Sequence, residues 1–123
     1  MKATITSVIF LLLSLAVSSQ TYKYIGIEEG LSNQKIYKIQ KDARGYMWFL
    51  THVGIDQYNG KEIKHYKLRE GNRELDPLLN INWTFLDKTG TLLVTGKQGR
   101  IFRYDSGHDR FVQIYNMYNY WNK

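Results

Sequence analysis

Hydrophobic residues along this chain gather in short runs, and turn-forming residues interrupt them about every ten positions. The run YMWFLT at residues 46–51 is apolar on both faces of an extended chain, which is typical of a strand packed between two layers. Asp-Ala-Arg-Gly precedes this run and Asn-Gly follows at residues 59–60. Both are turn signals, because Asp bonds its own backbone and Gly accepts positive φ. The pattern therefore predicts β-strands joined by tight turns, with runs too short for amphipathic helices.

The same pattern occurs twice in the chain. Residues 35–68 and residues 81–115 match at an offset of 45 residues, with one extra residue in the second copy after Gly99. Each copy predicts four short strands, and in the first copy these cover residues 35–41, 46–51, 55–58 and 62–68. The positions that we assign to the structural repeat are Asp42, Gly45, Trp48, Thr51, Gly54 and Tyr58, followed by Asp87, Gly90, Gly99 and Tyr104.

Repeated four-stranded units of roughly 40 to 50 residues with a buried second strand are the sequence form of β-propeller blades. We therefore predict an all-β chain with two blades of four antiparallel strands, at residues 35–68 and 81–115. An inter-blade loop at residues 69–80 joins them, and Pro77 limits any helix there to about one turn. A propeller closes with about 4 to 8 blades, so two blades form an incomplete propeller.

The two ends of the chain carry other signals. Residues 1–19 have Lys2, an apolar run and small residues before Gln20, which is the layout of a secretory signal peptide and predicts export. Residues 20–34 are expected to hold a leading strand at 21–27, which would complete the last blade of a ring, and an entry segment. The tail at residues 116–123 lacks a blade signature, and we expect its large apolar side chains to be exposed.

Composition narrows the possible partners and stabilising links. The chain has no cysteine, so packing alone must hold an exported fold together. Its net charge is +6, but the basic residues are scattered singly and form no basic run or helix. We therefore expect no nucleic-acid partner.

Residues 28–60 carry a longer motif. It comprises Gly-Leu-Ser, a hydrophobic strand, Asp-x-x-Gly, an aromatic strand with Trp that ends in Thr, then x-x-Gly and a strand containing Tyr. Its residues are Gly30, Leu31, Ser32, Ile36, Ile39, Asp42, Gly45, Trp48, Thr51, Gly54 and Tyr58. This order resembles the repeats of two-component regulator propellers. The second copy keeps Asp87, Gly90, Gly99, Tyr104 and Phe111 but has Leu93 in place of Trp, and the resemblance spans about residues 22–115.

The resemblance implies a function. Propellers of that family form the exported, periplasmic sensor half of hybrid two-component histidine kinases of glycan-degrading Gram-negative bacteria. The resemblance implies that this chain is the front portion of such a sensor, with ligand recognition and signal transduction as its role. The kinase and any membrane contact would belong to regions beyond this chain, which would also supply the remaining blades.

We find no catalytic grouping in the sequence. There is no cysteine nucleophile, no Gly-x-Ser-x-Gly and no glycine-rich phosphate loop, and the histidines at 52, 65 and 108 lack metal-ligand spacing. We assign Asp42 and Asp87 a role in forming turns and no catalytic role. We expect no enzyme activity, no catalytic or metal-binding residue and no cofactor.

Candidate ligand-binding residues come from loop positions. In a propeller, the loops between second and third strands open on the same face as the loops between successive blades. These loops carry His52, Asn72, Arg73, Lys97 and Gln98. Side chains of this kind bond sugar hydroxyls and acidic sugar carboxylates, which makes an oligosaccharide the expected ligand.

Two alternatives remain open beside the sensor. In the first, the chain is a complete secreted protein that assembles a ring from further copies of itself, because repeat units expose edges. In the second, the chain is a fragment of a propeller polysaccharide lyase or hydrolase.

Overall fold

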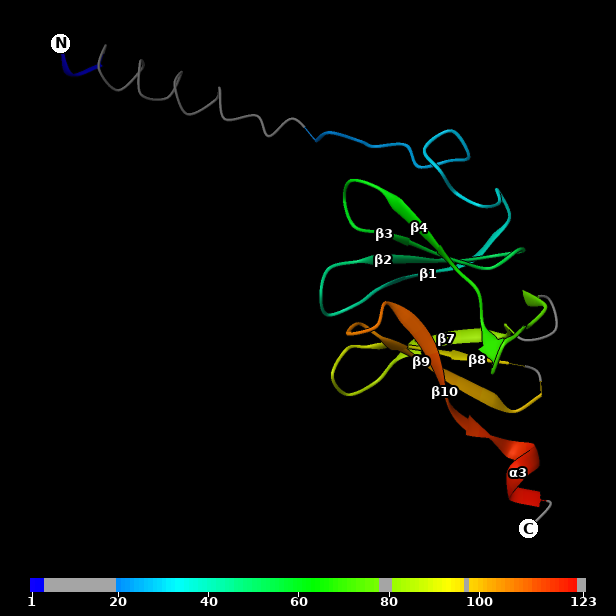
Figure 1. Ribbon diagram of the computed structural model, residues 1–123. Helices are drawn as coiled ribbons and strands as arrows, with labels where there is room; N and C mark the ends of the chain where they lie inside the picture. Colours follow the sequence, from blue (N-terminus) through cyan, green and yellow to red (C-terminus); the bar gives the residue numbers. More distant parts are fainter. Residues whose placement is uncertain (4–19, 78–80, 97, 122–123) are drawn as a thin grey trace.

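The computed structural model describes residues 1–3, 20–77, 81–96 and 98–121, and it contains two four-stranded antiparallel sheets (Figure 1). The first sheet, blade 1, has the order β1 (Ile36–Lys41), β2 (Met47–Thr51), β3 (Ile55–Tyr58), β4 (Ile63–Tyr66). The second sheet, blade 2, consists of β7 (Trp83–Leu86), β8 (Leu92–Thr95), β9 (Arg100–Asp105) and β10 (Arg110–Asn116), also joined in sequence order. The prediction of all-β, propeller-like blades is confirmed.

The Asp-x-x-Gly turns explain why the two copies share residue types. Oδ1 of Asp42 accepts hydrogen bonds from the amides two and four residues ahead, at 2.9 and 3.0 Å. Asp87 repeats this arrangement at 2.8 and 3.0 Å. Gly45 and Gly90 close the turns with φ of 88° and 75°, a region that favours glycine. The turn between the first two strands is therefore specified locally in each blade.

A hydrophobic core lies between the blades. Trp48 is 1% exposed, and its ring centroid lies 4.7 Å from that of Tyr104 and 5.7 Å from that of Phe111, both in blade 2. Edge-to-face contacts of this kind add to the free energy gained by burying aromatic surface. The buried residues of this core are Trp48, Leu50, Ile55, Tyr66, Leu68, Leu75, Leu92, Val94, Phe102, Tyr104 and Phe111.

The two blades are stacked face to face in the same sense, as Figure 1 shows. Trp48 contacts blade 2, whereas Leu93, its counterpart, lies on the face of blade 2 opposite to Leu92 and Val94 and therefore points away from blade 1. That outward face carries a row of Phe85, Leu93, Arg103 and Val112 across the sheet. Phe85 and Val112 are 39% and 37% exposed.

The Asp-x-x-Gly turns of the two blades touch. The amide of Ala43 donates to the carbonyl of Gly90 at 3.0 Å. A Cβ added to Gly90 would lie 2.4 Å from the Cβ of Ala43, which is closer than carbon atoms approach. Glycine is therefore needed here for the close approach as well as for the turn.

The leading strand predicted at residues 21–27 would complete the last blade of a ring and stays a prediction, because neither blade in the described ranges is the one it would join. These residues form no strand, and Tyr22 and Tyr24 are exposed, because no sheet edge of the described chain lies alongside to pair with them. The following segment instead folds back on blade 1. Leu31 is buried, and Ser32 donates from both its amide and its hydroxyl to the buried carboxylate of Asp56, each at 2.8 Å.

The inter-blade segment contains a small hairpin where the sequence predicted a loop. It pairs β5 (Arg69–Glu70) with β6 (Arg73–Glu74) around Gly71, and residues 78–80 lie outside the described part. Opposite charges face each other across the hairpin, which stabilises the pairing. A two-residue strand is too short to show periodicity in a sequence.

The tail folds into a short helix, α3 (Met117–Trp121), and its Met117, Tyr118, Tyr120 and Trp121 are exposed as expected. The predicted signal peptide falls mostly on residues 4–19, which lie outside the described residues. Within the described ranges, no helix is long and apolar enough to cross a membrane.

Candidate functional site

One side of the stacked blades collects the connections that the sequence singled out. Figure 1 shows the β2–β3 turn, the β5–β6 hairpin and the region between β8 and β9 on the same side. The turns that join β1 to β2 and β7 to β8 lie on the opposite side. We call the first side the loop face.

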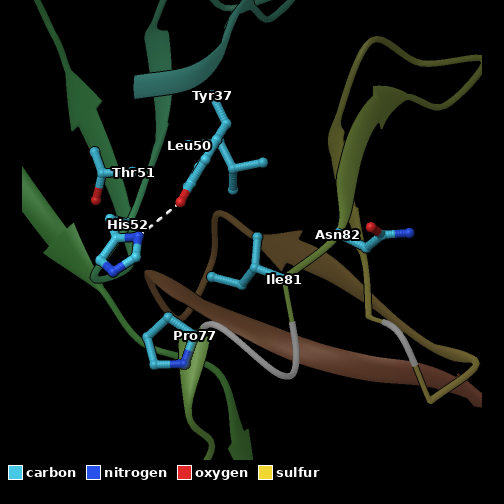
Figure 2. A pocket seen from close by; sticks show the side chains of 7 residues that line it. All are labelled: Tyr37, Leu50, Thr51, His52, Pro77, Ile81 and Asn82. Atoms are coloured by element: carbon cyan, nitrogen blue, oxygen red, sulfur yellow. Dashed lines mark hydrogen bonds between the residues drawn. The ribbon is translucent and has the colours of Figure 1, made fainter. Parts of the chain in front are cut away.

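A cavity of about 240 Å³ opens on the loop face and draws its walls from both blades (Figure 2). Its lining residues are Tyr37, Leu50, Thr51, His52, Pro77, Ile81 and Asn82. We call it the loop-face pocket. It combines an aromatic ring, apolar side chains and a few polar groups, which is the usual composition of a small-molecule site.

Tyr37 and His52 form a polar pair at the wall of this pocket. The Tyr37 hydroxyl lies 2.6 Å from Nδ1 of His52, and the Tyr37 side chain is about half exposed. The position of His52 is fixed by its amide, which donates to the carbonyl of Lys35 at 3.1 Å. The Lys35 ammonium lies 5.4 Å from the centroid of the Tyr37 ring and adds positive charge beside the pocket.

Asn82 supplies an unused amide. Its side chain is exposed, lines the pocket and forms no hydrogen bond with any residue in the described ranges. An amide offers both donors and an acceptor to a ligand. Asn82 and Tyr37 are 45 residues apart, which is the offset of the repeat, so stacking of the blades places equivalent positions at one pocket.

A second polar cluster joins the hairpin to blade 2. Oε2 of Glu70 lies 3.0 Å from Nη2 of Arg73 and 3.4 Å from Nη2 of Arg100. Arg100 is buried and also donates from Nη1 to the side chain of Gln98. The side chains of this cluster bind one another, so its first role is to hold the hairpin against the β8–β9 connection.

The five predicted ligand-binding residues therefore separate in space. His52 lines the loop-face pocket, while Arg73 and Gln98 belong to the Glu70–Arg100 cluster. Asn72 lies in the hairpin turn between Glu70 and Arg73 and does not line the loop-face pocket. Lys97 lies outside the described residues.

Sequence reasoning missed several of the residues that form these sites. Tyr37 and Asn82 complete the pocket, and Glu70 and Arg100 complete the cluster. For Tyr37 and Asn82, the sequence did carry a signal, because the two residues are separated by the 45-residue offset of the repeat. Nothing in the sequence marks the second pair, because isolated charges along a strand carry no sign of what they meet.

Most residues of the structural repeat occupy turns or the core. The indole N–H of Trp48 donates to Oδ2 of Asp42 at 2.8 Å, and Thr51 donates to the carbonyl of Gly54 at 3.1 Å. Tyr58 differs, because its hydroxyl donates to the carbonyl of Gly60 at 2.6 Å near the surface. These contacts position the strands and turns of the blade.

A carboxylate at the outer edge joins the two blades. Oδ1 of Asp109 accepts from the hydroxyl of Tyr66 at 2.6 Å and from that of Tyr104 at 2.7 Å, and Oδ2 lies 3.0 Å from Nζ of Lys64. These three hydrogen bonds, that of Tyr66 foremost, lower the pKa of Asp109 to about 2. Burial and the bond to Asp109 raise the pKa of Tyr66, so its hydroxyl stays a donor.

Ser32, His65 and Asp56 form the grouping most similar to a catalytic one. Both Ser32 Oγ and His65 Nδ1 lie 2.8 Å from the Asp56 carboxylate. The serine thus donates to the carboxylate, whereas a nucleophile donates to the histidine. This cluster fastens the entry segment to blade 1. In the described ranges, no group of three His, Cys, Asp or Glu side chains is placed to hold a metal ion.

Comparison with known proteins connects this architecture to a family. The family model described as two component regulator propeller matches residues 30–52. No curated protein matches the chain. The matched span begins at Gly30 in the entry segment and covers β1, the Asp42 turn and β2 with Trp48 and Thr51. Residues 30–52 are therefore similar to a repeat of the two component regulator propeller family, the family that the sequence of the chain resembles.

Proposed function

We propose that this chain is the front portion of an exported, periplasmic propeller sensor of a hybrid two-component regulator, and that it binds an oligosaccharide on its loop face. The observation that carries the proposal is the family repeat at residues 30–52, set in the first of two blades stacked in the same sense. In this role the chain recognises a ligand and transmits its presence without performing chemistry. The kinase belongs to another part of the regulator.

The outward face of blade 2 supports a longer propeller. Its row of Phe85, Leu93, Arg103 and Val112, apolar except for Arg103, corresponds to the face of blade 1 that contacts blade 2. In a propeller each blade covers its neighbour, because one sheet cannot bury both faces alone. A third blade stacked in the same sense would bury this row.

The loop-face pocket supports an oligosaccharide as the ligand. The half-exposed Tyr37 ring offers an apolar surface for the C–H groups of a sugar, and the unused Asn82 amide offers donors and an acceptor for its hydroxyls. Because Tyr37 comes from blade 1 and Asn82 from blade 2, a ligand that contacts both favours one arrangement of the blades. Ligand binding would in this way change the arrangement of the blades, and that change is the signal we propose.

Isothermal titration calorimetry with a panel of neutral and acidic oligosaccharides tests this proposal. We expect saturable binding by at least one glycan, reduced about tenfold by Tyr37→Ala and by Asn82→Ala. Tyr22→Ala removes an exposed tyrosine outside the pocket and should leave the affinity unchanged. Binding that is equally strong in all three variants would place the ligand elsewhere, and no binding by any glycan would contradict the proposed ligand.

Self-assembly is a second candidate, favoured by the same exposed face of blade 2. Further copies of the chain would cover the row and complete a ring. Light scattering after size-exclusion chromatography of residues 20–123 separates the two candidates. A discrete trimer or tetramer supports the ring. A reading frame that continues into further blades and a transmembrane kinase supports the sensor.

A further inference from the structure

A groove of about 700 Å³ runs along the outer edge of the two blades, away from the loop-face pocket. One wall consists of residues 65–67 at the end of β4 and residues 69–72 of the β5–β6 hairpin. The other wall consists of residues 109–113, at the start of β10. We call it the rim groove. Its size is that of a ligand site, and the loop-face pocket shares no lining residue with it.

The rim groove is bordered by the edges of two sheets. β4 and β10 are the outermost strands of blade 1 and blade 2. Five consecutive residues, 109–113, line the groove, although successive side chains of a strand point to opposite faces. The main chain of β10 therefore borders the groove. β5 lies beside β10 without pairing to it, so the outer edge of β10 has no strand partner in the described ranges.

The charges of the rim groove favour an anion. Lys67, Arg69 and Arg110 line it. Lys67 and Arg69 pair with Glu74, at 2.6 and 4.0 Å, whereas the side chain of Arg110 forms no hydrogen bond or ion pair with any residue in the described ranges. The two lining carboxylates are already paired, Glu70 with Arg73 and Arg100, and Asp109 with Lys64. The guanidinium of Arg110 is thus the positive charge of the groove that is available to a ligand.

A buried acceptor in the same groove lacks a donor. Oε1 of Gln113 is inaccessible to solvent and has no hydrogen-bond partner. Gln113 lies on the groove wall formed by β10. A buried polar atom left unpaired costs free energy, so turning the Gln113 side chain toward an N–H group of a ligand in the groove recovers that cost.

We propose that the rim groove binds an extended acidic peptide segment of a partner protein, which adds to the outer edge of β10 as a further strand. Main-chain hydrogen bonds to β10 supply affinity, and a carboxylate of the peptide selects the groove by pairing with Arg110. The regular amides of a peptide match the repeat of a strand edge, whereas sugar hydroxyls have no such register. The site does not depend on the oligosaccharide site of the loop face.

Fluorescence anisotropy of the purified chain with a labelled peptide of alternating Glu and Thr tests the proposal. We expect saturable binding that weakens with added salt. The same peptide methylated on alternate amides should bind about tenfold more weakly, because it cannot pair as a strand. A peptide with Lys in place of Glu should not bind.

Two variants locate the binding. Arg110→Gln should weaken it about fivefold, whereas Lys61→Gln removes the same charge from the β3–β4 turn and should have no effect. Gln113→Leu should also weaken binding without lowering the stability of the free chain, since its Oε1 is unpaired there. Circular dichroism confirms that each variant is folded.

Three outcomes would overturn the proposal. Equal affinity for the methylated peptide would mean attraction by charge without strand addition. Displacement of the peptide by an oligogalacturonate would assign the groove to acidic saccharides. Absence of binding at millimolar peptide in low salt would show that the edge of β10 takes no acidic strand.

Discussion

The indole N–H of Trp48 donates to Oδ2 of Asp42 at 2.8 Å, and this bond ties the first turn of blade 1 to the core between the blades. Blade 2 has Leu93 at the position of Trp48, and leucine has no donor. There Oδ2 of Asp87 instead accepts from Nε of Arg103 at 2.9 Å. The two repeats thus hold the same turn with different donors, one buried and one at the surface.

Asp42→Ala should destabilise the chain by about 2 to 3 kcal/mol, because it removes the bond to Trp48 and leaves buried donors unpaired. Asp87→Ala should cost about 1 kcal/mol, since the Arg103 side chain it releases is 44% exposed and reaches water. Urea unfolding followed by far-UV circular dichroism measures both. Equal losses of stability in the two variants would show that the bond to the buried indole N–H of Trp48 contributes no more than the bond to the exposed Arg103 side chain.

Stability should fall in acid through Asp109. The native contacts lower the pKa of its carboxyl from 3.8 to about 2, so the folded state binds its proton less readily than the unfolded state. The stabilisation is complete above about pH 4 and is lost as the pH falls toward 2. Wild type should therefore lose more stability in this window than Asp109→Asn, a residue that tolerates the positive φ of 49°.

The matched control is Glu28→Gln, because Glu28 forms no contact of this kind in the described ranges. Its acid profile should follow that of wild type. Parallel profiles for wild type and Asp109→Asn would rule out this carboxyl as the source of the acid sensitivity.

Asp56→Ala should release the entry segment from blade 1. The substitution removes both bonds from Ser32 and the bond from His65, and should cost about 2 to 3 kcal/mol. Limited trypsin digestion should then cleave after Lys35 faster than in wild type. Ser32→Ala, which keeps the amide bond to Asp56, should have an intermediate rate. Unchanged cleavage in Asp56→Ala would mean that other contacts, such as the burial of Leu31, hold the segment.

Lys38 and Trp83 should be energetically coupled across the two blades. Nζ of Lys38 lies 4.1 Å from the Trp83 ring centroid and also donates to the carbonyl of Thr84. A double-mutant cycle with Lys38→Met and Trp83→Leu should give a coupling of about 0.5 to 1 kcal/mol in urea unfolding. A coupling near zero would show that the cation and the ring act independently.

The sequence predicted those parts of the fold that short-range chemistry decides. Turn residues such as Asp42 and Gly45 act within five residues, and the buried second strand is apolar on both faces. The leading strand stays a prediction, because a strand exists only beside a partner and residues 21–27 have none in the described chain.

The candidate site was predicted only in part. His52 was found because loop-face positions follow from the repeat, but Tyr37 faces the pocket from inside a strand and Asn82 from the adjacent blade. The link between Glu70 and Arg100 depends on a hairpin that no periodicity reveals. Such contacts become visible only when two blades are stacked.

The contact between Ala43 and Gly90 has a consequence for the ring as a whole. It sets how closely two neighbouring blades approach on the side opposite the loop face, and so the rotation from one blade to the next. A side chain at position 90 would push the two turns apart and change that rotation. Since a closed ring divides a full circle among its blades, a glycine at this position in the repeats of a propeller would help to decide how many blades close the ring.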